Sequence, residues 1–137
     1  ARGAKRALRL AVSAPFHCAL MRPAAERLAR ELGQVEITAP AWPVVTNVEA
    51  EPNRDPGRVR ELLMRQVTAP VRWEESVQRL TSMGVASAVE VGFGNVLAGL
   101  VRRIAPALQV HAAGDAESIS ALVGRGDALE PKEQRHA

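Results

Sequence analysis

The chain has 137 residues, of which 47% are hydrophobic and only 3% aromatic, and its formal net charge is +3. This length suits one ordinary domain, and this hydrophobic content excludes general disorder. Because large aromatic side chains are scarce, the core must be built mainly from Ala, Val and Leu, which is typical of helices packed closely on a sheet. A single cysteine allows no internal disulfide, and neither a membrane-spanning apolar run nor a cleavable signal pattern is visible. The composition therefore favours a reducing, cytoplasmic setting.

Positive charge is concentrated in the first thirty positions, where Lys and Arg side chains are opposed by Glu26 alone. Such a surface suits an acidic macromolecular partner, although ordinary solvated side chains are the simpler interpretation. Nucleic acid is disfavoured as the partner, because aromatic residues for base stacking are nearly absent and no nucleic-acid-binding motif is recognisable.

The first half of the chain predicts two strands and two helices. Alternating apolar positions predict a half-buried strand over residues 8–12. A helix is expected from about Met21, with Gly33 as a left-handed cap at its end. The apolar run at residues 44–48 predicts a buried parallel strand, and a loop follows it. The second helix is expected to begin after Asp55, a good N-cap followed by proline.

The second half alternates helix and strand more regularly. After a break at Ala69-Pro70, apolar spacing predicts a third helix from Trp73 that stops at Gly84. Strands are expected at residues 87–91 and 109–113, and helices at residues 96–104 and around Ile119. This alternation predicts a mostly parallel sheet of three or four strands, covered on both faces. A sheet of that size would leave apolar faces uncovered unless further strands were supplied from elsewhere.

One histidine has a position that suits chemistry. His17 follows an extended segment and directly precedes a helix, where loops commonly carry functional residues. A lone histidine is more often structural or exposed, so its position alone leaves both interpretations open.

Three blocks of sequence resemble the malonyl-CoA:acyl carrier protein transacylases, in the family's order and at similar spacing. They are residues 12–21 (VSAPFHCALM), 65–73 (RQVTAPVRW) and 90–100 (EVGFGNVLAGL). The blocks correspond to roughly the C-terminal two-fifths of a typical member, so the chain is expected to be one part of an enzyme. The third block departs from the family at Phe93, where proline usually stands between the two glycines, and is interpreted as a structural turn.

The resemblance implies an α/β fold: part of an α/β-hydrolase-like parallel sheet with covering helices, with an inserted ferredoxin-like subdomain. Residues 1–14 would be the last strand of that small subdomain and the return to the core. Residues 15–123 would be the C-terminal part of the acyltransferase core, and residues 124–137 a polar, frayed tail.

The resemblance also implies the reaction, which is transfer of a malonyl group from CoA to the phosphopantetheine thiol of acyl carrier protein through a malonyl-serine intermediate. His17 would be the general base. No serine of this chain has glycine two positions before and two after it, so the nucleophile of the family's G-x-S-x-G elbow is not in this chain. The family's malonyl-binding arginine and oxyanion-hole donors are expected to be missing as well. No bound cofactor and no metal is implied, since CoA and phosphopantetheine thioesters are the substrates.

Further site residues follow from the resemblance. Gln66 matches the position whose backbone carbonyl orients the histidine base, and the alternative is an ordinary polar residue at a helix end. Phe16 would shape the acyl pocket against an α-methyl branch, and the alternative is core packing. Independently of the resemblance, Cys18 is expected to be a small buried hydrophobe rather than a nucleophile, because adjacent side chains on a turn usually diverge. The basic surface for the carrier protein would be formed by Arg2, Lys5, Arg6 and Arg9.

Two other functions stay open at this point. The chain could be a non-catalytic remnant that binds an acidic carrier protein, or a fragment of a polyketide-synthase-type acyltransferase. The partners expected on the first interpretation are acyl carrier protein, malonyl-CoA and the missing N-terminal part of the same enzyme, with no nucleic acid and no membrane.

Overall fold

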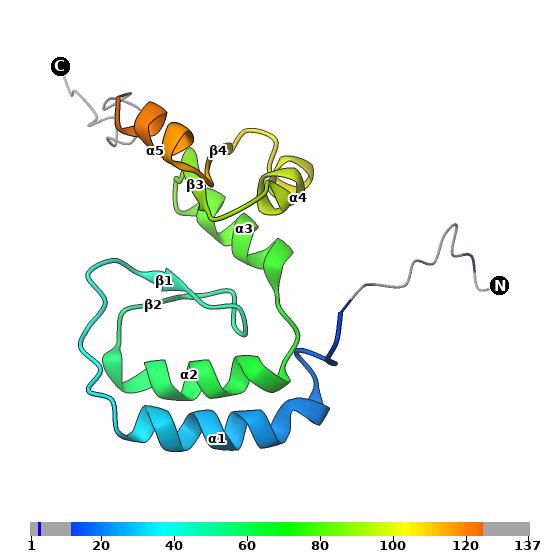
Figure 1. The fold of residues 1–137 in the computed structure, drawn as a ribbon, viewed down its shortest axis with the longest axis vertical. Coiled ribbons are helices and arrows are strands. Elements are labelled where there is room, and N and C mark those ends of the chain that lie inside the picture. The colour runs from blue at the N-terminus through cyan, green and yellow to red at the C-terminus, as the bar shows by residue number, and fades with distance from the viewer. Residues whose placement is uncertain (1–2, 4–11, 125–137) are drawn as a thin grey trace. The chain divides into compact units, whose positions relative to one another are not determined.

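The structure is a computed structural model that describes Gly3 and residues 12–124. The predicted strand at residues 8–12 therefore lies outside the described residues except for its last position. The same is true of Arg2, Lys5, Arg6 and Arg9, and of the tail beyond residue 124. The chain divides into two compact units, Ala1–Val71 and Arg72–Ala137, each of which has its own helices and strands (Figure 1).

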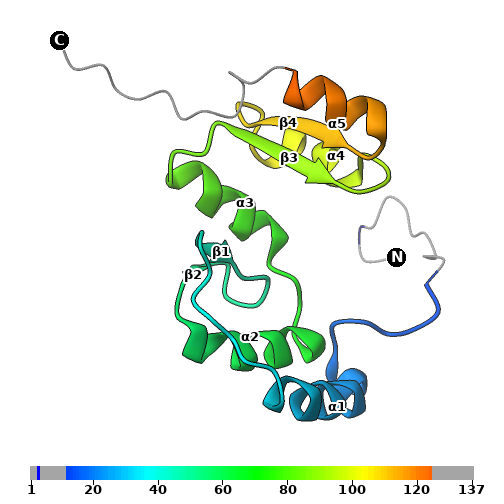
Figure 2. The same cartoon turned by 60° about the vertical axis from the view of Figure 1, so that its left-hand side comes forward.

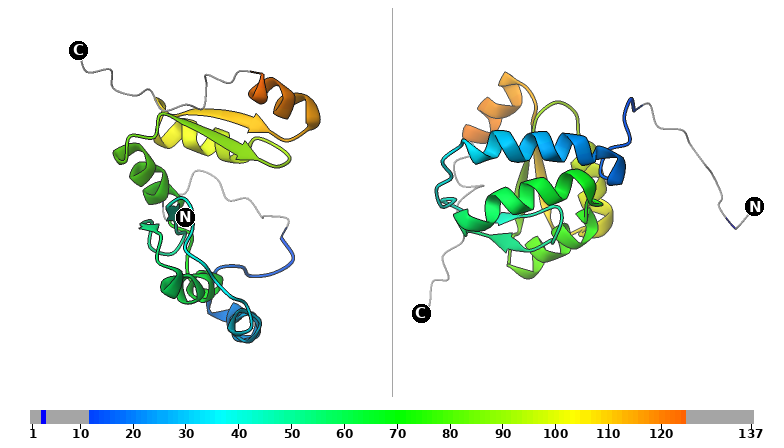
Figure 3. Two further views of the ribbon diagram at one scale, coloured as in Figure 1. Left: turned by 90° about the vertical axis from the view of Figure 1, so that its left-hand side faces the viewer. Right: turned by 90° about the horizontal axis from the view of Figure 1, so that it is seen from below.

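The first unit packs two helices side by side with a small hairpin against the second of them. A 3-10 turn, η1 (Ala19–Met21), leads into α1 (Arg22–Gly33), which lies along α2 (Pro56–Thr68) (Figures 1 and 3). The hairpin consists of β1 (Val44–Val45) and β2 (Pro52–Asn53), which pair antiparallel.

Helix α2 begins and ends where the sequence predicts. The Asp55 side chain accepts a hydrogen bond from the Gly57 backbone N–H at 2.8 Å, and Pro56 occupies the first helical position. At the other end Ala69 is extended, with φ −110° and ψ 153°, as expected for a residue that precedes proline. Leu62 is the buried residue of this helix, so the face of α2 that carries it packs against the rest of the unit.

The predicted left-handed cap at Gly33 is wrong. Gly33 is the last residue of α1 and is not among the glycines with positive φ. The backbone N–H groups of Gln34 and Val35 bond the carbonyls of Glu31 and Leu32 at 3.1 and 3.3 Å. From α2, the Arg60 guanidinium also donates to the carbonyl of Leu32 at 2.8 Å and to that of Val35. Tight backbone bonds and a cation near the C-terminal end of a helix together satisfy its last carbonyls, so a left-handed glycine is not needed here.

The predicted buried parallel strand at residues 44–48 is also wrong. Only Val44 and Val45 are in a strand, their partners are antiparallel, and Val44 is 55% exposed. The chain turns back immediately after them. Ala50, which is buried, has a positive φ of 58° and closes the turn through its N–H to the carbonyl of Thr46 at 2.8 Å.

The second unit is a parallel βαβ arrangement with flanking helices. Its elements are α3 (Trp73–Ser82), β3 (Ser87–Val91), α4 (Val96–Ile104), β4 (Gln109–Ala113) and α5 (Ala116–Val123). Strands β3 and β4 pair in parallel along their whole length, and α4 is the crossover between them (Figure 2). The strand-helix-strand order predicted for this half is confirmed.

The core of the second unit joins α3 and α4 to one face of the sheet. Val77 of α3, Val101 of α4 and Leu108 form its buried cluster, against which Ala88 and Val110 of the two strands pack. Gly84 lies just after the C-terminal end of α3 and has a φ of 84°. This left-handed conformation is the one expected of a glycine that stops a helix. The described residues thus contain two two-stranded sheets, one of them parallel, instead of the three or four parallel strands expected.

Candidate active site

His17 is held in a strained, exposed position just before the first helical turn. Its φ is 57°, in the left-handed region that few non-glycine residues adopt, and its side chain is exposed. Backbone strain of this kind costs of order 1–3 kcal/mol and is concentrated at functional sites. The neighbouring Cys18 is half-buried, and its thiol donates to the Pro15 carbonyl at 3.0 Å.

The imidazole of His17 meets the backbone of α2. Its Nδ1 lies 2.9 Å from the carbonyl oxygen of Gln66, a residue 49 positions further along the chain. A carbonyl oxygen only accepts hydrogen bonds, so in the neutral imidazole the proton must be on Nδ1. Nε2 is then left with a lone pair that can accept a proton, which is the arrangement a general base requires.

The carbonyl of Gln66 is available because it lies in the last turn of α2. The final carbonyls of a helix have no N–H partner further along the same helix. The helix end therefore supplies an acceptor for the ring nitrogen, the task that a carboxylate performs in many catalytic triads.

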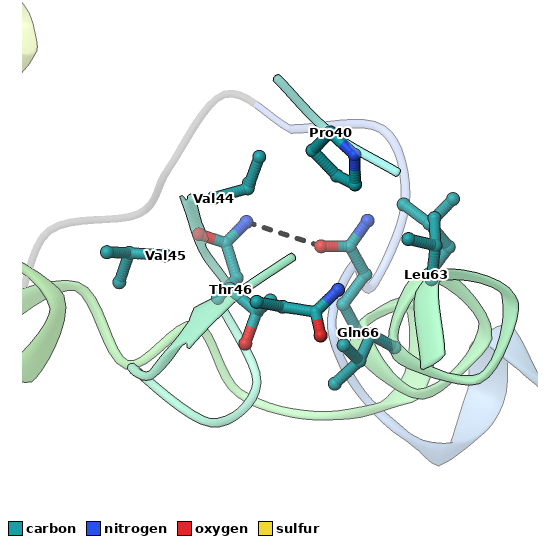
Figure 4. Close-up of a pocket in the computed structure, with 10 residues that line it drawn as sticks. Pro40, Val44, Val45, Thr46, Leu63 and Gln66 are labelled. Atoms are coloured by element: carbon teal, nitrogen blue, oxygen red, sulfur yellow. Dashed lines mark hydrogen bonds between the residues drawn. The ribbon is translucent and has the colours of Figure 1, made fainter. Parts of the chain in front are cut away.

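The side chain of Gln66 has a separate contact on another side. Its Oε1 lies 3.5 Å from the Asn47 amide nitrogen, and both residues line an open, mostly apolar pocket between the hairpin and α2 (Figure 4). Its other lining residues are Pro40, Val44, Val45, Thr46, Asn53, Val59, Leu62 and Leu63.

An ion-pair group fastens the turn of the hairpin to α2 beside Gln66. The Glu49 carboxylate accepts from Arg65 at 2.6 Å and from Arg58 at 2.8 Å, and Arg65 also contacts Glu61 at 3.0 Å. Hydrogen bonding from Arg65, with a further contribution from Arg58, holds the pKa of Glu49 below its ordinary value of 4.5. Hydrogen bonding to Glu49, with a further contribution from Glu61, raises the pKa of Arg65. Sequence reasoning missed this group; only the Glu61–Arg65 spacing of four residues could have indicated part of it.

Phe16 is 57% exposed and is not among the residues that line the pocket beside Gln66. Its exposure argues against the core-packing alternative, and its role toward an acyl group stays a prediction.

In the second unit, Gly92 and Gly94 both have positive φ, so this turn requires glycine for backbone reasons. The Glu90 carboxylate caps the following helix by accepting from the N–H groups of Leu97 and Ala98 at 3.0 and 2.9 Å.

Within residues 12–124 no group of three or more His, Cys, Asp or Glu side chains could hold a metal ion. None of the helices in this part of the chain has the length and apolar character needed to cross a membrane.

The fold of this chain resembles part of acyl-carrier-protein malonyltransferases of known structure. A crystal structure of the acyl carrier protein S-malonyltransferase from Vibrio cholerae superposes with a TM-score of 0.82 at 46% identity, covering 88% of this chain and 39% of that one. A malonyl-transacylase solved in complex with a type II PKS acyl-carrier protein gives a TM-score of 0.82 at 47% identity, covering 90% of this chain and 40% of that one.

Curated relatives make the relationship specific. The malonyl CoA-acyl carrier protein transacylase of Salmonella typhimurium is 46% identical over 123 residues, which are 90% of this chain and 40% of the relative. That of Bacillus subtilis strain 168 is 41% identical over 121 residues, or 88% of this chain and 38% of the relative. No protein-family model matches. The chain is therefore homologous to the malonyl CoA-acyl carrier protein transacylases and corresponds to a C-terminal portion that spans about 40% of their length.

Proposed function

We propose that this chain is the C-terminal portion of a cytoplasmic malonyl-CoA:acyl carrier protein transacylase and that His17 is its general base. The observation that carries the proposal is the 2.9 Å contact between His17 Nδ1 and the Gln66 carbonyl, which leaves Nε2 free to accept a proton. The similarity to transacylases over 90% of the chain supports the same assignment. The serine nucleophile would lie in the part of the relatives that this chain does not span.

Two half reactions would use the same nitrogen. In the first, Nε2 of His17 takes the serine hydroxyl proton as the serine oxygen attacks the malonyl thioester carbon, and the proton passes to the CoA sulfur as the C–S bond breaks. In the second, Nε2 takes the proton of the phosphopantetheine thiol as its sulfur attacks the serine ester, and returns it to the serine oxygen as the C–O bond breaks. The Gln66 carbonyl keeps the ring oriented and stabilises the imidazolium formed in each half.

Other parts of the assignment complete the proposal. The chain would contribute to an α/β-hydrolase-like core, with residues 1–14 returning from a ferredoxin-like subdomain. Arg2, Lys5, Arg6 and Arg9 would attract the acidic carrier protein.

The test is a His17→Ala variant of the complete enzyme, meaning this chain together with the portion that its relatives carry before it. Loss of a general base lowers the rate by about 10²–10⁴-fold, so malonyl transfer to carrier protein should fall by that factor while the melting temperature changes little. His111→Ala, on strand β4, is the matched control and should transfer malonyl normally. Near wild-type turnover by His17→Ala would remove His17 from the chemistry.

A further inference from the structure

In this chain the carbonyl of Gln66 lacks the backbone N–H donor that a regular α-helix would provide. In an α-helix the carbonyl of one residue accepts from the N–H four residues later, and for Gln66 that residue is Pro70. Proline has no backbone N–H. The carbonyl that contacts His17 is thus the one that lacks its helical N–H donor, because residue 70 is proline.

Proline acts on the same carbonyl in a second way. Its ring disfavours helical dihedral angles at the preceding residue, and Ala69 is extended accordingly. Helix α2 ends at Thr68, so no continuing turn covers the Gln66 carbonyl. One residue earlier the pattern differs, since the Arg65 carbonyl has the Thr68 hydroxyl 3.5 Å away. The carbonyl of Gln66 instead has His17 Nδ1 at 2.9 Å.

We infer that Pro70 is a positioning residue for the reaction, because its missing N–H leaves the Gln66 carbonyl free to hold the His17 imidazole. This inference rests on the proposed function for its kinetic consequence, but the hydrogen bond it concerns can be observed without turnover. Pro70 itself touches no substrate in this scheme and acts through Gln66 and His17.

The inference predicts what restoring the donor does. In Pro70→Ala the restriction on Ala69 is relieved, α2 can extend, and the new N–H at position 70 competes for the Gln66 carbonyl. A carbonyl oxygen has two lone pairs, so the competition weakens the contact to His17 without abolishing it. A weakening worth about one neutral hydrogen bond corresponds to roughly a five- to tenfold lower kcat.

The decisive comparison separates the missing N–H from the proline ring. Lactic acid incorporated in place of Pro70 gives an alanine-like side chain joined through an ester, which has no N–H and no ring. Both variants are made in the complete enzyme, with Pro106→Ala in the second unit as a control for the general effect of losing a proline. The readouts are kcat and the ¹⁵N NMR signals of the His17 ring, which report the fraction protonated on Nδ1.

Pro70→Ala should lower kcat about five- to tenfold and reduce the Nδ1-protonated fraction, whereas the lactic acid variant and Pro106→Ala should resemble the wild type in both readouts. An unchanged His17 tautomer in folded Pro70→Ala would overturn the inference, as would a lactic acid variant that behaves like Pro70→Ala. If Pro70→Ala does not fold, the lactic acid variant decides alone, because a folded form with a disturbed tautomer refutes the role of the missing N–H. If the wild-type enzyme transfers no malonyl group, the proposed function fails while the tautomer measurement still judges the inference.

Discussion

The two functional groups of Gln66 can be separated by mutation, because the structure uses them differently. Its carbonyl lies 2.9 Å from His17 Nδ1, whereas its side-chain oxygen lies 3.5 Å from the amide nitrogen of Asn47. A contact of 3.5 Å is at the long limit for a hydrogen bond and contributes at most about 0.5 kcal/mol. Even if all of that reached the transition state, Gln66→Ala would change kcat only about twofold.

Gln66→Pro should behave differently from Gln66→Ala. Proline inside the last turn of α2 removes one helical hydrogen bond and collides with the preceding turn, at a cost of about 3 kcal/mol or more. The backbone that presents the carbonyl to His17 would then be displaced. Malonyl transfer should be severely reduced even in the fraction of protein that remains folded.

The assay is transfer from malonyl-CoA to carrier protein by the complete enzyme, with thermal unfolding measured in parallel. Asn47→Ala is the matched control, because it removes the same 3.5 Å contact from the other side and should also have a small effect. If Gln66→Ala were as damaging as His17→Ala while remaining folded, the side chain would be the functional group, and the assignment to the carbonyl would be refuted.

Two further predictions concern charge. The folded-state pKa of Glu49 is lowered by Arg65 and Arg58, so its stabilising contribution is present above its ordinary pKa of 4.5 and is lost as the pH falls through the lower folded value. Urea unfolding of wild type and Glu49→Gln at neutral pH and in this acid range should show a difference that shrinks in acid; a constant difference would contradict the ion-pair account. Replacing Arg2, Lys5, Arg6 and Arg9 with Glu should slow association with acidic carrier protein, an effect that fades with salt because exposed charges are screened within about 8–10 Å at physiological ionic strength. Salt-independent association, measured by stopped flow, would exclude the electrostatic role.

Features encoded by neighbouring residues were predictable. Asp55 and Pro56 begin α2, Pro70 follows its last residue, and Gly84 prevents α3 from continuing. These residues were informative because each acts on backbone groups only a few positions away. The strand-helix-strand order of residues 87–113 followed from apolar periodicity in the same way. His17 and Gln66 were identified by family resemblance, and the structure brings them into hydrogen-bonding distance.

Features that join distant parts of the chain were not predictable. Gly33 was expected to end α1 by its own conformation, but tight backbone bonds and Arg60 of α2 together satisfy the last carbonyls of that helix. The run at residues 44–48 was expected to be buried and parallel, but pairing with β2 makes it a hairpin.

The sequence by itself therefore determined where most helices and strands begin and end, since capping groups, proline and glycine act within one turn. Only the tertiary structure decided which carbonyls Arg60 reaches, that Glu49 is held by Arg65, and that His17 takes a left-handed backbone conformation where it contacts α2. The physical reason is that these contacts bridge 16 to 49 positions of the chain. Helix packing, rather than local preference, sets which of the possible donors and acceptors come within 3 Å of each other.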